Sequence, residues 1–138
     1  MESKSEQRTP PIVLVVDDEA SMRALERRVL EGLGYSVLEA TNGGDLVDLL
    51  AGGAHFDLLI ADLNMPVVRG DEMARRIRRS RPELRVLYCT GHADWLMDGG
   101  ALLHGEALLP KPFSADQLRD AVSELLSRQE SPSKTSTD

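Results

Sequence analysis

The sequence predicts a doubly wound α/β domain with a parallel sheet, and three observations indicate it. Short apolar runs alternate with longer stretches in which apolar residues recur at helical spacing. This alternation of strand and helix occurs five times along the chain. The first apolar run, over 12–16, is continuous and β-branched, as expected of a strand that is buried on both faces. Right-handed crossovers would then place helices on both faces of the sheet.

Composition and charge narrow the functional classes. The chain has 138 residues, which favours a single domain, and 41% of them are hydrophobic, enough to build a core. The net charge of −7 argues against general nucleic-acid binding, because such binding requires a basic surface. The single cysteine, Cys89, cannot form an internal disulfide and lies in an apolar run, so we expect it to be a buried core residue.

No segment predicts membrane insertion or export. The apolar runs are too short to cross a bilayer, and the polar start of the chain lacks the apolar centre of a signal peptide. We therefore expect a cytoplasmic protein that does not bind membranes. Residues 1–10 and 129–138 are polar and predict disordered tails on either side of one domain over 11–128.

The first half of the predicted domain holds two strands and two helices. After the strand over 12–16, a helix is indicated by one apolar stripe, which consists of Met22, Leu25, Val29 and Leu33. Gly32 and Gly34 end this helix. The next strand, over 35–40, has mixed polarity, which favours an edge of the sheet. Asn42 is placed to cap the second helix.

The second half continues the alternation. Its elements are a strand over 56–61, a helix over 71–80, a strand over 84–89, a weak helical segment over 93–97, a strand over 107–109 and a final helix. The helix over 71–80 begins with acidic and ends with basic residues, which suits the helix dipole. A capping box at Ser114–Gln117 marks the start of the final helix, whose stripe includes Leu118 and Val122.

Polar side chains follow four of the predicted strands. Asp17 and Asp18 follow the first strand and Asp62 follows the third, while Thr90 and Lys111 follow the last two. Ligands of open parallel sheets bind at the carboxyl ends of the strands, so we expect these side chains to converge. Three carboxylates repel one another unless a cation lies among them. The sequence therefore predicts a metal site that a basic group faces.

The residue types indicate which metal and which chemistry. Carboxylates from separate strand ends are ligands for a hard cation such as Mg²⁺, and the three histidines have no zinc-like spacing. Asp62 could serve only as a ligand, or it could be a nucleophile towards a phosphoryl group. Phosphoryl transfer also requires cations and hydrogen-bond donors around the phosphoryl oxygens, and Lys111 and Thr90 are of these types.

Taken together, these residues form an ordered pattern that covers nearly the whole chain. It consists of Asp17-Asp18, Asp62-Leu63-Asn64-Met65-Pro66 with Gly70, Thr90-Gly91 and Lys111-Pro112-Phe113. The pattern resembles the receiver domain of two-component response regulators. The segments around Thr90 and Lys111 look most like receivers of hybrid histidine kinases.

The resemblance implies a fold, a cofactor and partners. It implies a flavodoxin-like sheet with strand order 2-1-3-4-5, and Asp62 as the acceptor of a phosphoryl group from a histidine kinase or histidine phosphotransfer protein. Mg²⁺ would be bound by Asp18 and Asp62 directly, by Asp17 through water and by the carbonyl of Asn64. Thr90 and Lys111 would hold the phosphoryl oxygens, and the Lys111–Pro112 bond would be cis.

The chain departs from the family at one point and suggests two modulators. Many receivers have a switch aromatic three residues before the lysine, where this chain has Leu108. Asn64 and His92 are placed to influence how long a phosphoryl group survives on Asp62, and His92 titrates near neutral pH. The arginines of the helix over 71–80 are expected to be solvated, whereas those of the first helix could dock a phosphodonor.

Two other functions agree less well with the sequence. A phosphatase of the haloacid dehalogenase type would need a general acid two residues after its nucleophile, and Asn64 cannot transfer a proton. A flavin or dinucleotide site would need a glycine-rich turn after the first strand. We expect a receiver that is not an enzyme beyond its own phosphorylation. It would signal to an unknown downstream protein, either as a stand-alone chain or as part of a hybrid kinase. The sequence is compatible with a homodimer.

Overall fold

The sheet has the predicted architecture. A computed structural model describes residues 10–63, 70–91 and 102–127. Five parallel strands lie in the order β2-β1-β3-β4-β5, so the predicted fold is confirmed. The strands are β1 (Ile12–Val16), β2 (Ser36–Ala40), β3 (Leu58–Asp62), β4 (Arg85–Thr90) and β5 (Glu106–Pro110). β2 is at an edge, as its mixed polarity predicts.

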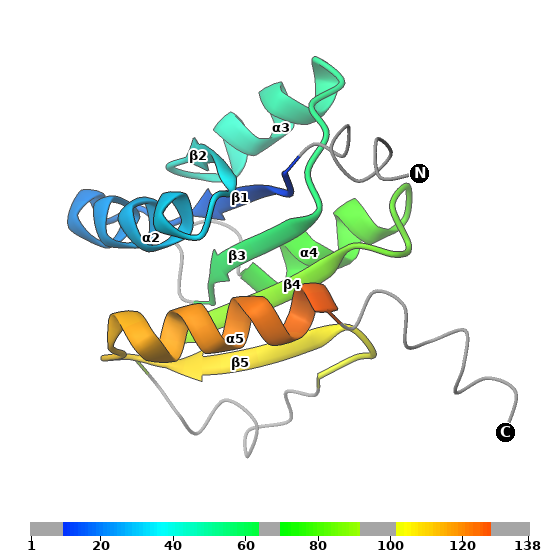
Figure 1. The fold of residues 1–138 in the computed structure, drawn as a ribbon. Coiled ribbons are helices and arrows are strands. Elements are labelled where there is room, and N and C mark those ends of the chain that lie inside the picture. Colours follow the sequence, from blue (N-terminus) through cyan, green and yellow to red (C-terminus); the bar gives the residue numbers. More distant parts are fainter. Residues whose placement is uncertain (1–9, 64–69, 92–101, 128–138) are drawn as a thin grey trace, which may run out of the picture.

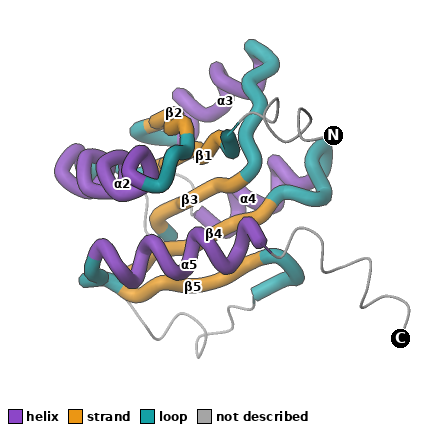
Figure 2. Tube along the Cα trace, in the orientation of Figure 1, coloured by secondary structure: helices purple, strands orange, loops and turns teal. Residues whose placement is uncertain are grey.

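Helices cover both faces of the sheet (Figures 1 and 2). They are α2 (Ala20–Gly32), α3 (Gly43–Ala51), α4 (Gly70–Arg78) and α5 (Ala115–Ser127). α2 and α5 contact each other on one face, and α3 and α4 cover the other. None of the helices within the described ranges is long and apolar enough to cross a membrane. The predicted helical segment over 93–97 and the predicted tails, apart from Pro10, lie outside the described residues.

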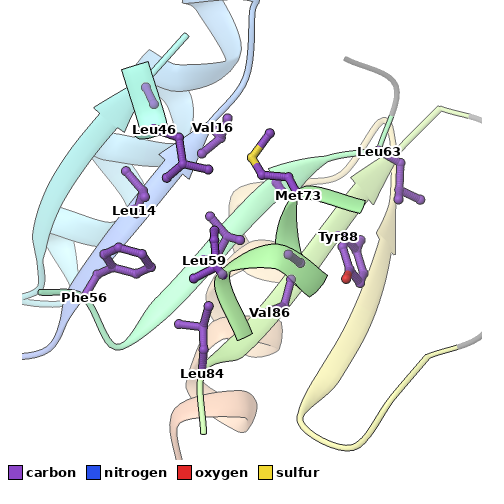
Figure 3. Close-up of a cluster of buried hydrophobic side chains, with 14 residues drawn as sticks. Leu14, Val16, Leu46, Phe56, Leu59, Leu63, Met73, Leu84, Val86 and Tyr88 are labelled. Atoms are coloured by element: carbon purple, nitrogen blue, oxygen red, sulfur yellow. The ribbon is translucent and has the colours of Figure 1, made fainter. Parts of the chain in front are cut away.

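Two apolar clusters, one on each face, form the core. The cluster under α3 and α4 is shown in Figure 3 and includes Leu14, Val16, Leu46, Phe56, Leu59, Leu63, Met73, Leu84, Val86 and Tyr88. The cluster under α2 and α5 consists of Val13, Val15, Val29, Leu30, Leu58, Ile60, Leu87, Cys89, Leu109, Leu118, Val122 and Leu125. Alternate residues of each central strand therefore pack on opposite faces, which holds the strand ends in a fixed plane.

The predicted local signals are present. The Asn42 side chain accepts a hydrogen bond from the Asp45 N–H at 3.0 Å and so caps α3. Ser114 and Gln117 exchange two side-chain to backbone hydrogen bonds at the start of α5, as a capping box does. The Lys111–Pro112 peptide bond is cis, as predicted. Cys89 is buried and free.

The prediction for the first helix needs correction. Of the predicted stripe Met22, Leu25, Val29 and Leu33, only Val29 is buried; the other three are half-buried, and Leu33 lies just past the end of α2. The buried residues of α2 are instead Glu26, Val29 and Leu30. A carboxylic acid therefore occupies a position of the helix that faces the core.

Candidate functional site

Three carboxylates converge at the carboxyl edge of the sheet. One carboxylate oxygen from each of Asp17, Asp18 and Asp62 lies within 4.8 Å of the other two. Asp17 and Asp62 are buried, whereas Asp18 is exposed, so the cluster opens to solvent on one side. The sequence prediction that these strand ends meet is therefore confirmed as geometry.

Backbone contacts explain how Asp17 is held. β1 ends at Val16, but the Asp17 N–H still donates to the Ala40 carbonyl at the end of β2, at 3.2 Å. The Asp17 Oδ1 atom accepts the Glu19 N–H at 2.9 Å, which tightens the turn into α2. One carboxylate oxygen is thus fixed by the backbone, and the other remains for a cation.

Lys111 supplies that cation from the far end of the chain. Its Nζ atom lies 3.4 Å from Asp17 Oδ2 and 3.3 Å from Asp62 Oδ2. The backbone N–H of Lys111 donates to the Thr90 carbonyl at 2.7 Å, which continues the β4–β5 ladder past the end of β5. Burial by itself lowers the pKa of the Lys111 ammonium, but attraction to Asp17 and Asp62 outweighs it and the pKa is raised. The lysine therefore stays charged.

The cluster carries more negative charge than one lysine can neutralise. Burial raises the pKa of the Asp17 carboxyl, although the hydrogen bond from Glu19 and the charge of Lys111 oppose this, and the charge of Asp62 adds to it. The donor set consists of carboxylate oxygens alone, which suits a hard divalent cation such as Mg²⁺. The residues present are therefore suited to hold a divalent metal ion between Asp17, Asp18 and Asp62.

The other predicted site residues are only partly described. Thr90 is the last residue of β4, which pairs with β3, and it is buried. Asn64 and His92 lie outside the described residues. Leu108 lies half-buried against the cluster under α3 and α4, opposite Tyr88 in the β4–β5 register.

Another buried carboxylate, that of Glu106, was not predicted from the sequence and is held by Tyr88. The buried Glu106 side chain accepts the Tyr88 hydroxyl at 3.0 Å and the Leu103 N–H at 2.8 Å, and the Nε atom of Arg78 lies 3.9 Å away. Burial and the neighbouring Glu106 carboxylate raise the pKa of Tyr88. The aromatic of this region is therefore tied to β5 by its hydroxyl group.

Glu26 of α2 was not among the predicted site residues either. Glu26 is 1% exposed, and its Oε1 atom has no hydrogen-bond partner among the described residues. The pKa of Glu26 is raised from 4.5 to about 8, chiefly by burial and also by the charges of Asp17 and Asp62, against the attraction of Lys111 and Arg23. The helical spacing from Met22 to Val29 and Leu30 includes position 26, so the stripe itself contained the signal.

Comparison with known proteins agrees with the site. The family of response regulator receiver domains matches residues 13–123. Sensor kinase CckA of Brucella abortus (strain 2308) is 31% identical over 120 residues, which are 86% of this chain and 13% of the kinase. Sporulation initiation phosphotransferase F of Bacillus subtilis (strain 168) is 32% identical over 119 residues, covering 83% of this chain and 92% of that protein.

A solved structure and the relative lengths complete the comparison. The crystal structure of a response regulator receiver protein from Sinorhizobium medicae WSM419 has a TM-score of 0.77 and 29% sequence identity, and covers 88% of this chain and 98% of that one. The DNA-binding transcriptional regulator NtrC of Escherichia coli (strain K12) is 33% identical over 109 residues, and the match covers 23% of it. The matched part is thus less than a quarter of the kinase and of this regulator.

Proposed function

The chain belongs to the response regulator receiver family of two-component signalling, and we propose that it accepts a phosphoryl group on Asp62 from a phosphohistidine. The observation that carries this proposal is the convergence of the Asp17, Asp18 and Asp62 carboxylates, two of which, Asp17 and Asp62, contact the Lys111 ammonium. An isolated carboxylate is a weak nucleophile, and an anionic phosphoryl group repels it. Cations on both sides of the reacting oxygen remove that repulsion.

In the proposed reaction, an Oδ atom of Asp62 forms a bond to phosphorus as the phosphorus–nitrogen bond of the donor breaks. The leaving imidazole takes up a proton, and Asp62 becomes an acyl phosphate. A bound Mg²⁺ supplies charge neutralisation at the phosphoryl oxygens. Asp17, Asp18, Asp62 and the Asn64 carbonyl would hold it, while Lys111 and the Thr90 hydroxyl would bind phosphoryl oxygens.

The proposed partners follow from this chemistry. The donor would be a histidine kinase or a histidine phosphotransfer protein, and the output would be contact with a downstream protein. The names of two relatives support a place in such signalling, since the Brucella abortus relative is named a sensor kinase and the Bacillus subtilis relative a sporulation initiation phosphotransferase. The proposal includes no turnover of an external substrate beyond phosphorylation and dephosphorylation of the chain itself.

A single labelling experiment tests the proposal. The chain is incubated with acetyl phosphate, with and without Mg²⁺, and the phosphorylated residue is located by mass spectrometry. We expect one phosphoryl group on Asp62, formed only with Mg²⁺ and absent in Asp62→Asn. Asp57→Asn is the matched control. Asp57 precedes the amino end of the same strand, where it accepts the Ile12 N–H, and it is not one of the three clustered carboxylates.

Two results would contradict the proposal. Labelling of Asp62→Asn at full yield would place the acceptor elsewhere. Equal labelling of the native chain with and without Mg²⁺ would remove the metal from the reaction, because the repulsion among the three carboxylates would then need no cation.

A further inference from the structure

The loop between β1 and α2 carries two of the three clustered carboxylates. Asp17 and Asp18 lie on it, and the loop lies outside both the sheet and the helix. Asp18 is exposed, so side-chain packing does not fix its position. Its place is set by the backbone on either side of it, and the Asp17 carbonyl belongs to the peptide group that joins the two residues.

Arg23 forms hydrogen bonds to this loop through its backbone N–H and through its side chain. Its backbone N–H donates to the Glu19 carbonyl at 3.1 Å, in the first turn of α2. Its side-chain Nη1 donates to the Asp17 carbonyl at 2.7 Å. One residue of the helix therefore holds the loop from both ends, and the second bond fixes the plane of the Asp17–Asp18 peptide group.

The guanidinium of Arg23 is itself held in place. Its Nε atom donates to Glu39 Oε1 at 3.1 Å, and Glu39 lies in β2. The other oxygen of Glu39 accepts from Nε of Arg27 at 2.6 Å, and Arg27 also contacts Glu31 at 2.7 Å. The side chain of Arg23 is only 18% exposed, so it is less free than a solvated surface arginine. This arrangement leaves Arg23 directed towards the loop rather than towards a docking protein.

We propose that Arg23 is a positioning residue of the metal site, which orients the Asp17–Asp18 peptide group so that both carboxylates can bind one divalent cation. The inference rests on the proposed function, because it assumes that the cluster binds a metal ion. Arg23 does not touch the clustered carboxylate oxygens in this role. It acts through the main chain.

The sign of the change in metal affinity distinguishes a positioning role of Arg23 from a purely electrostatic effect of its charge. A guanidinium near a cation site repels the cation, so loss of its charge alone should tighten metal binding. Loss of a group that orients ligands weakens metal binding, typically by about tenfold or more. The two explanations therefore predict opposite changes for Arg23→Gln.

Direct binding of Mn²⁺, with free Mn²⁺ measured by electron paramagnetic resonance, tests the proposal without any phosphorylation. We expect Arg23→Gln to bind Mn²⁺ about tenfold more weakly than the native chain. Arg23→Lys keeps a donor for the Asp17 carbonyl and should lie between the two. Arg27→Gln is the matched control, because it removes the neighbouring guanidinium from Glu39 and leaves the Asp17 carbonyl bond in place.

Each outcome decides the matter. Equal or tighter binding by Arg23→Gln, or an equal loss in Arg27→Gln, would overturn the inference. Native chain that binds no Mn²⁺ would overturn the metal site of the proposed function together with it, whereas native binding with an unaffected Arg23→Gln overturns the inference alone. If Arg23→Gln fails to fold, Glu39→Ala decides, because it removes the acceptor of the Arg23 Nε hydrogen bond and so releases the guanidinium from β2. Unchanged Mn²⁺ affinity in that variant would refute the positioning role.

Discussion

Replacing Glu26 by glutamine should change how the stability of this protein depends on pH. Glu26 is buried in α2 and its pKa is raised from 4.5 to about 8, chiefly by burial. The folded chain therefore holds a proton that the unfolded chain releases at lower pH. The stability connected with this proton is fully present below about pH 4.5 and is lost as the pH rises through about 8.

The shift sets the magnitude. Each pKa unit corresponds to about 1.4 kcal/mol, so the whole shift is worth about 5 kcal/mol between acidic and alkaline conditions. Over the practical range from about pH 6 to about pH 9, roughly half of this stability is lost. Glutamine has the same shape and does not titrate, so Glu26→Gln should remove this loss.

Urea unfolding followed by circular dichroism at several pH values measures the effect. We expect the free energy of unfolding of the native chain to fall more steeply with pH than that of Glu26→Gln. The buried amide of the variant makes it less stable than the native chain at low pH, and the two curves should cross. Glu31→Gln, which changes a half-exposed carboxylate of the same helix, is the control and should keep the native slope.

Parallel stability curves of the native chain and Glu26→Gln over this pH range would refute a raised pKa of Glu26. Such a result would mean that the carboxylate of Glu26 finds water or a partner when it ionises, so that burial does not raise its pKa. A pH dependence of stability that disappears in Glu31→Gln would also refute the assignment to Glu26, because the titrating group would then be on the surface.

Two further predictions concern stability. Tyr88→Phe removes the hydroxyl that donates to the buried Glu106 carboxylate, so it should lower the free energy of unfolding in urea by about 1–3 kcal/mol. Tyr35→Phe, at a half-buried position, is the control, and equal losses in the two variants would refute the role of the Tyr88 hydroxyl. Asn42→Ala removes the cap of α3 and should cost about 1 kcal/mol, whereas Asn42→Asp, which can still accept the Asp45 N–H, should stay near the native value.

Local sequence signals predicted the frame of the site well. Asn42 and Ser114 predict helix starts because their side chains accept backbone N–H groups next to them in the sequence, and the structure contains both caps. Asp17 and Asp62 were placed together because parallel strands end at one edge. These predictions needed only neighbouring residues or the direction of a strand.

Contacts that depend on tertiary packing could not be predicted in the same way. Glu26 lies on the buried stripe of its helix, but the residue type argued for exposure, and only the packing of α2 on the sheet and α5 shows its burial. The bond from Arg23 to the Asp17 carbonyl depends on the conformation of a long side chain. One strand boundary shifted for a similar reason, since Phe56 is the first residue of the predicted strand but precedes β3 and packs under Arg81.

The site joins residues that are far apart in the sequence, and this has a consequence for protein synthesis. Lys111 reaches Asp17 across 94 positions and Asp62 across 49. A growing chain on the ribosome therefore has all three carboxylates long before it has the lysine that faces them. Until the last strand has left the exit tunnel and paired with β4, these carboxylates repel one another without the charge of Lys111. The ability to accept a phosphoryl group should thus arise late, when β5 pairs with β4 and brings Lys111 to the carboxylates.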